Sequence, residues 1–148
     1  MVIYMKNILS FIRLPLKIKK ILLEASVALL LAKILISFTK LKSITKLLGK
    51  SNRVTRGADT DIDLLKVSEV SYSVQTMSRF TPWESNCLVQ ACAAKYMLNR
   101  RNQPGTVYFG LAKDEKGSII AHAWVKCGKH FVTGGDGSTH FITTGSFS

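Results

Sequence analysis

Hydrophobic positions in the first third of the chain recur at steps of three and four residues. From Pro15, a residue type suited to the first turn of a helix, one apolar face runs through Leu16, Ile18, Ile21, Leu22, Ala25 and Leu29. This pattern predicts a long helix over about residues 15–38. A shorter pattern over 41–48 ends at Gly49, a residue type that often terminates helices. The chain is therefore expected to begin with two helices.

The middle of the chain is expected to contain a connector and two more helices. Residues 50–63 lose the apolar rhythm and gain polar residues and a glycine, which indicates a connector. A helix over 63–78, capped by Asp61 or Asp63, is expected to turn four side chains inward: Leu64, Leu65, Val67 and Val70. Pro82 prevents this helix from continuing, because the residue before a proline avoids the helical region.

The next helix begins after Asn86, a favourable N-cap residue, and ends near Asn99. The apolar period then changes to two. Strands are predicted at 106–112 and 119–126, around a turn at 114–117, and again at 131–133 and 140–144, with a loop at 134–137 between them. Helices followed by a meander of strands indicate an α+β fold.

The positive charge is concentrated at the start of the chain. The formal net charge is +12, and residues 1–50 carry ten Lys or Arg against the single acid Glu24. Such a segment suits an anionic partner, either phospholipid, nucleic acid or an acidic peptide. The aromatic residues lie in the less basic part, whereas single-strand binders interleave rings with cations, so we expect no nucleic-acid partner. We divide the chain into a basic helical segment, 1–50, and a catalytic domain, 51–148.

Residues 21–38 approach the length of a membrane span, about 20 residues. Glu24 and Lys33 interrupt this stretch, and a lysine at the centre of a span is costly. We expect a buried or interfacial helix, with peripheral membrane contact through residues 13–50. The three cysteines lack a CxxC spacing, and no small-residue cleavage site follows the apolar stretch. Both features favour free thiols in the cytoplasm.

A thiol stands at the first position of the helix expected after Asn86. Catalysis by cysteine requires a thiolate, and the free N–H groups and positive dipole end of a helix N-terminus favour that negative charge. The same N–H groups can bind an oxyanion. We therefore predict Cys87 as a nucleophile. The competing interpretation is a small apolar residue at a helix start.

A base and an orienting group for this thiol are expected in the strand-rich half. His122 stands between two alanines in the second predicted strand, where a buried imidazole requires polar partners. The only acid after it is Asp136, in a Gly-Gly-Asp-Gly loop. Together with Cys87, these residues fit the roles of nucleophile, base and orienting group. The alternatives are a histidine bonded to backbone and an aspartate that only forms a turn.

A zinc site is the alternative reading of the remaining cysteines and histidines, Cys92, Cys127, His130 and His140. Structural zinc sites normally use paired ligand motifs, and the Cys127–His130 turn has no second pair. Cys92 also falls on a different face of its helix from Cys87. We expect neither a metal ion nor a cofactor.

Four segments of the sequence together point to a known family: Trp83-Glu-Ser-Asn-Cys87-Leu-Val-Gln-Ala91, a helix ending at Arg100-Arg101, Tyr-Phe-Gly-Leu, and Ala121-His122-Ala-Trp-Val125. In these segments the chain resembles the transglutaminase-like peptidases that cut the leader from lasso-peptide precursors. The first helices are also similar to the basic N-terminus of such proteins, in Leu14-Pro15 and Leu23-Glu24-Ala25.

This resemblance implies a papain-like core, in which a catalytic helix packs on a small antiparallel sheet behind a basic helical segment. It also implies a cysteine protease with Cys87, His122 and Asp136 at its site. The substrate would be a ribosomally made precursor, whose leader is delivered by a small separate recognition protein. The released core peptide would pass to an ATP-dependent macrolactam synthetase.

No separate leader-binding domain is recognisable ahead of the catalytic part, so we expect dependence on the recognition protein. The basic face of residues 13–50 is a candidate docking surface for it. Two other functions fit the sequence. A transglutaminase-type acyl transferase would use the same three residues, because both reactions pass through an acyl-enzyme. A basic membrane- or nucleic-acid-binding module would account for the charge alone.

Overall fold

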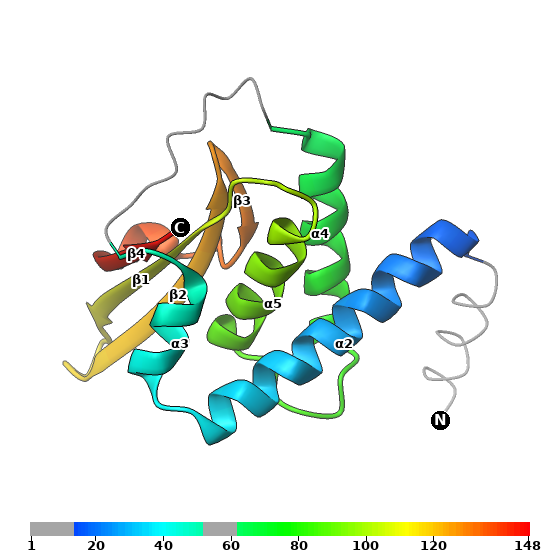
Figure 1. Ribbon diagram of the computed structural model, residues 1–148. Helices are drawn as coiled ribbons and strands as arrows, with labels where there is room; N and C mark the ends of the chain where they lie inside the picture. The colour runs from blue at the N-terminus through cyan, green and yellow to red at the C-terminus, as the bar shows by residue number, and fades with distance from the viewer. Residues whose placement is uncertain (1–13, 52–61) are drawn as a thin grey trace.

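The computed structural model describes residues 14–51 and 62–148, and it confirms the α+β fold (Figure 1). The helices come first: α2 (Leu16–Phe38), α3 (Leu41–Leu48), α4 (Leu64–Ser78) and α5 (Cys87–Asn99). The strands follow: β1 (Thr106–Lys113), β2 (Ile119–Cys127), β3 (His130–Thr133) and β4 (Ile142–Phe147). A short 3-10 helix, η2 (Ser138–His140), separates β3 from β4.

The four strands form one antiparallel sheet in the order β3-β2-β1-β4. The expected meander holds for β1, β2 and β3, but β4 is not placed next to β3. It pairs instead with β1, at the opposite edge of the sheet. The segment between β3 and β4 therefore has to pass from one edge of the sheet to the other, and part of it forms η2. The last strand therefore begins at Ile142, two residues later than expected, and runs to Phe147.

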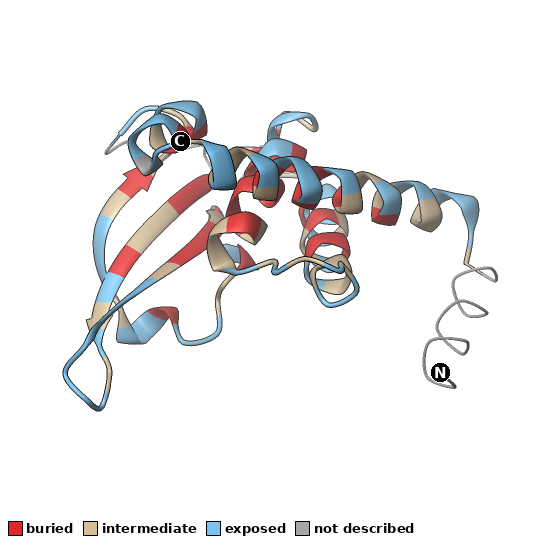
Figure 2. Cartoon of the chain, turned by 90° about the horizontal axis from the view of Figure 1, so that it is seen from below, coloured by how far each residue is buried: buried red, intermediate tan, exposed pale blue. Residues whose placement is uncertain are grey.

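The core lies between the helices and one face of the sheet. α5 occupies the centre, because it contacts α2 and α4 on one side and β2 on the other. It meets them through small and medium side chains that are fully buried, Val89, Ala91, Ala94, Met97 and Leu98. From α2 the same core receives Leu22, Ala25, Ala28, Leu29 and Ala32 (Figure 2). The position of α5 is thus determined from both sides.

Three leucines that were expected to point inward are exposed. Leu64 and Leu65 on α4 are 53% and 77% exposed, and Leu16 on α2 is 74% exposed. Val67 and Val70 are buried as expected. Leu64 and Leu65 lie in the first turn of α4, before its first buried residue. Leu16 lies on the side of α2 opposite to the residues that this helix buries.

Polar contacts fix the ends of these helices. The Asp63 carboxylate accepts hydrogen bonds from the N–H groups of Leu65 and Lys66, at 3.1 and 3.3 Å, and so caps α4. Asp61, the other candidate cap, lies outside the described residues. The Arg101 guanidinium donates to both carboxylate oxygens of Glu24, at 3.0 and 2.6 Å, which joins the end of α5 to α2. The hydrogen bond from Arg101 lowers the pKa of Glu24.

Candidate active site

Cys87 is the first residue of α5, as expected. The side-chain oxygen of Asn86 accepts a hydrogen bond from the N–H of Val89 at 3.1 Å, which caps the helix. Gln90 braces the preceding loop, because its Nε2 donates to the carbonyl of Ser85 at 2.8 Å. The thiol is half-buried at the positive end of the helix, where the N–H groups of the first turn favour a negative charge.

β3 forms a neighbouring wall and is tied to α4 through one carbonyl. The Val132 carbonyl accepts hydrogen bonds from Ser71 Oγ at 2.8 Å and from Gln75 Nε2 at 2.9 Å. Both donors are side chains of α4, so they hold the edge strand against a helix that also contacts α5. The loop after β3 leaves from this anchored point.

His122 is held by that loop. Its Nε2 lies 2.9 Å from the carbonyl oxygen of Gly134. A carbonyl only accepts hydrogen bonds, so Nε2 carries the proton and Nδ1 of the neutral ring is left as a base. The ring lies on the same face of β2 as Trp124, and its centroid is 5.9 Å from the indole ring and 5.0 Å from the Phe141 ring. The imidazole thus has a defined tautomer and aromatic neighbours.

One cleft of about 510 Å³ joins these elements, and Cys87, His122 and Asp136 all line it. Its other walls come from α4 and β3, and Arg79 adds a positive charge at the end of α4. Asp136 is exposed and, within the described parts of the chain, has no hydrogen-bond or ion-pair partner. The hydrogen-bond partner of the His122 imidazole is instead the backbone carbonyl of Gly134, two residues before Asp136 in the chain. The orienting role of Asp136 stays a prediction.

The other two thiols have different surroundings. Cys92 and Cys127 are buried, and burial raises the pKa of Cys92 to about 11. Burial also raises the pKa of Cys127, although the neighbouring Lys95 acts against it. No cluster of three or more metal-ligating side chains occurs within residues 14–51 and 62–148. Cys87 is therefore the thiol that the cleft exposes to chemistry.

The sequence argument missed the group that holds His122. A backbone carbonyl leaves no mark on residue identity, and the only signal was the pair of glycines after Thr133. Gly134 has a φ of +67°, and a Cβ there would lie 2.6 Å from the carbonyl oxygen of Ala123. Only glycine fits this conformation and this close approach. Arg79 and Gln90, which also line the cleft, were not singled out either.

Comparison with protein families adds the decisive observation, because the model of the transglutaminase-like superfamily matches residues 28–144. The chain belongs to this superfamily. The match begins inside α2 and extends into β4, so it includes the helix of Cys87 and the strand of His122. Transglutaminase-like proteins are typically cysteine proteases or acyl transferases. Neither the curated proteins nor the solved structures that were searched contain a match to the chain.

Proposed function

We propose that this transglutaminase-like protein is a cysteine peptidase that removes the leader from a ribosomally made lasso-peptide precursor. The observation that carries the proposal is the shared cleft, which is lined both by a thiol at a helix N-terminus and by a histidine whose Nε2 is bound to a backbone carbonyl. The specificity for a lasso-peptide leader rests on the sequence resemblance around Cys87 and His122.

In the proposed reaction, the Cys87 thiol gives its proton to Nδ1 of His122, and the sulfur attacks the carbonyl carbon of the scissile bond. The N–H groups at the start of α5 precede the helical hydrogen-bond ladder, so they can bind the oxyanion. The imidazolium returns the proton to the leaving amine, and the C–N bond breaks. Water then attacks the thioester carbon and loses a proton to His122. The C–S bond breaks, the carboxylic acid is released, and the imidazolium returns its proton to the Cys87 thiolate.

His122 has to change charge twice in this cycle without moving. The Gly134 carbonyl suits that task, because it accepts a hydrogen bond from the Nε2–H group in both the neutral and the charged ring. We assign Asp136 as the third member of the site. Its carboxylate at the cleft rim would stabilise the imidazolium, while the carbonyl fixes the ring.

The proposed partners rest on the same sequence resemblance. The leader would be presented by a separate recognition protein, and the freed core peptide would be taken by an ATP-dependent macrolactam synthetase. Arg79 lines the cleft beside the catalytic groups and offers a positive charge to the bound segment of the precursor. No cofactor is needed, because the thiol, the imidazole and water complete the hydrolysis.

The test is incubation of the protein with a lasso-peptide precursor and the recognition protein for its leader, followed by mass spectrometry. We expect two fragments from the wild type and none from Cys87→Ala or His122→Ala. Cys92→Ala is the matched control, because it removes a thiol from the same helix without touching the cleft.

Retained cleavage by Cys87→Ala would overturn the proposal. A single product that has lost ammonia would instead identify an acyl transferase, in which an amine resolves the same thioester. Circular dichroism of each variant shows that the fold is intact.

A further inference from the structure

The side of α2 that faces away from the core is largely apolar, with the exposed Lys20 as an exception. Seven large side chains there are exposed: Leu16, Leu23, Val27, Leu30, Leu31, Ile34 and Phe38. They recur at helical spacing on the side opposite the buried residues, so they form one outer stripe about 34 Å long. Figure 2 shows this exposed side of α2 along the edge of the molecule. A helix at the surface of a soluble domain normally has polar residues there, so the outer stripe marks an interaction surface.

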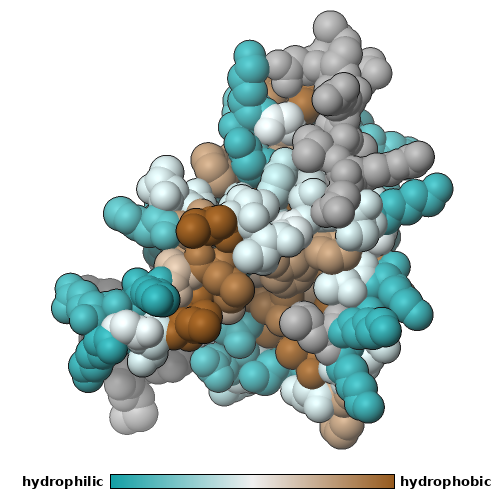
Figure 3. Space-filling model, turned by 90° about the vertical axis from the view of Figure 1, so that its left-hand side faces the viewer, coloured by the Kyte–Doolittle hydropathy of each residue, from teal (hydrophilic) through white to brown (hydrophobic). Residues whose placement is uncertain are grey.

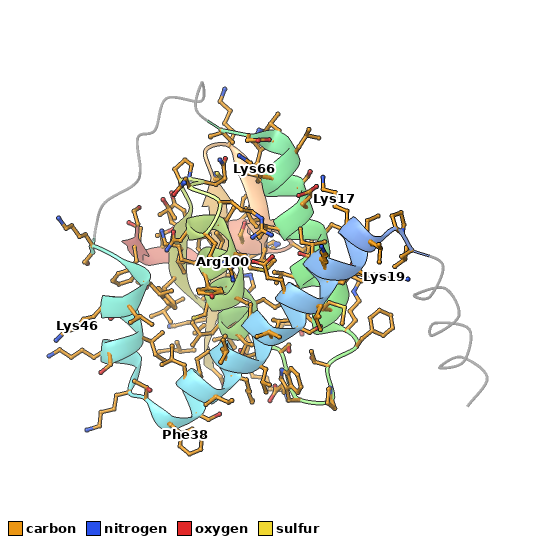
Figure 4. The ribbon with its side chains drawn as sticks, turned by 45° about the vertical axis from the view of Figure 1, so that its right-hand side comes forward. Lys17, Lys19, Phe38, Lys46, Lys66 and Arg100 are labelled. Atoms are coloured by element: carbon orange, nitrogen blue, oxygen red, sulfur yellow. The ribbon has the colours of Figure 1, made fainter. Side chains whose placement is uncertain are left out.

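The segment that carries the outer stripe is rich in lysine, and Lys17 is paired with Glu69 of α4 at 2.6 Å. The segment from residue 14 to residue 51 contains a single acid, Glu24, which is bound to Arg101. It contains these lysines: Lys17, Lys19, Lys20, Lys33, Lys40, Lys42, Lys46 and Lys50. In Figure 4, Lys46 projects outward from α3, and Phe38 projects from the nearby end of α2. Figure 3 shows the side of the molecule on which α3 and the sheet lie, where long hydrophilic side chains also stand around hydrophobic ones. The face is apolar and cationic together.

We propose that the outer stripe and the lysines of α2 and α3 bind the surface of an anionic lipid bilayer, with α2 lying in the plane of the membrane. Apolar side chains would enter the boundary between headgroups and acyl chains, and lysines would meet the phosphates. Within the described residues, α2 alone has the length and composition of a membrane span. It does not span, because Ala25 and Leu29 on its other side are fully buried in the core.

The charge selects lipid over another copy of the chain. Two copies joined through this face would bring two lysine-rich surfaces together, and like charges oppose such contact. A protein partner would have to provide an equally long apolar face with an acidic rim. An anionic bilayer provides both without a matching shape.

Binding in this orientation leaves the cleft open. The residues that line the cleft come from α4, α5, β2, β3 and the loop after β3, and none comes from α2 or α3. The inference is therefore independent of the proposed peptidase function, and either can fail without the other.

The experiment is sedimentation of the full chain with large phosphatidylcholine vesicles, with and without phosphatidylglycerol. We expect binding only to the anionic vesicles, and weaker binding as salt screens the charges. Leu31→Ser with Phe38→Ser should lower the partition coefficient by about tenfold or more per residue. Lys42→Gln with Lys46→Gln should lower it by about fivefold per lysine.

Matched controls remove comparable exposed groups from other faces. Leu65→Ser with Ile142→Ser removes two apolar side chains that are each 77% exposed, and Lys113→Gln with Lys116→Gln removes two lysines of the β1–β2 hairpin. These controls should bind like the wild type. Far-UV circular dichroism and melting temperature establish that every variant is folded.

Absence of sedimentation with anionic vesicles would overturn the inference. Binding that survives both sets of changes on α2 and α3 would also overturn it, because another segment would then be responsible. If the same changes abolish association with the recognition protein while no vesicle binds, the face is a protein-docking surface and the lipid assignment is wrong.

Discussion

Replacing Gly134 by alanine separates the role of its carbonyl from the general cost of disturbing the loop. Gly134 has a φ of +67°, where an alanine costs about 1–2 kcal/mol. The new Cβ would also lie 2.6 Å from the Ala123 carbonyl oxygen and 3.0 Å from Trp124 Cβ. Overpacking of this kind costs about 1–3 kcal/mol. The variant should therefore lose about 2–5 kcal/mol of an ordinary domain stability of about 5–15 kcal/mol, so its melting temperature is measured before its activity is compared.

The contact cannot be relieved by a side-chain rotation, because the closest atom belongs to the backbone. The loop must shift, and its carbonyl moves away from His122 Nε2. A displacement of a catalytic group by about 1 Å can cost roughly a hundredfold in rate, so we expect about that loss of kcat/KM for precursor cleavage. The rate of Cys87 alkylation by iodoacetamide at neutral pH should also fall, because that reaction depends on the thiol–imidazole pair and needs no peptide substrate.

Gly137→Ala is the control in the same loop. Its φ is +79°, but no atom lies within 4 Å of the position of the added Cβ. It pays only the backbone cost of about 1–2 kcal/mol and leaves the carbonyl in place. Equal kcat/KM and equal alkylation rates for the two variants, measured well below their melting temperatures, would refute the reasoning that the Gly134 carbonyl positions the base.

Three further predictions concern the thiols, the acid at the cleft rim and the contact between α2 and α5. Iodoacetamide should modify only Cys87 in the native protein at neutral pH, because the other two thiols are buried, and peptide mapping with a second modified cysteine would contradict this. Asp136→Asn should lower kcat by about tenfold, the order expected for one screened charge, whereas His122→Ala abolishes cleavage; equal losses would make the carboxylate as essential as the base. Glu24→Gln should lower the free energy of unfolding by about 1.5–3 kcal/mol, because Arg101 keeps only a neutral partner. That hydrogen bond lowers the pKa of Glu24 in the folded protein. Its contribution to the free energy of unfolding is therefore fully present above the unfolded pKa and is lost as the pH falls through the folded pKa. Urea titrations of the wild type and the variant should converge in acid.

Local signals in the sequence predicted most of the secondary structure. Asn86 and Gly49 act on backbone groups only a few residues away, so their effect can be read without knowing the rest of the fold. The same holds for the period-two pattern of β1 and β2. The position of Cys87 at the start of α5 followed from such a signal, and the structure has it there.

Contacts between distant residues could not be read in this way. β4 leaves its sequence neighbour β3 and pairs with β1, because the available edge of the sheet decides the pairing. Periodicity predicted that Leu22, Ala25 and Leu29 share one face of α2, and the structure buries all three. It could not show that the opposite side, which is also apolar, is left uncovered, and it placed Leu16 on the wrong side.

The sequence by itself determined the α+β order of elements, the thiol at a helix start and the histidine within a strand, because each depends on residue type and near neighbours. Only the tertiary structure decided that these groups line one cleft, that a carbonyl of Gly134 holds His122, and that α2 leaves one apolar side uncovered. Those features depend on how separate segments pack. The identity of a residue does not reveal what its backbone carbonyl binds or whether a face of its helix is covered.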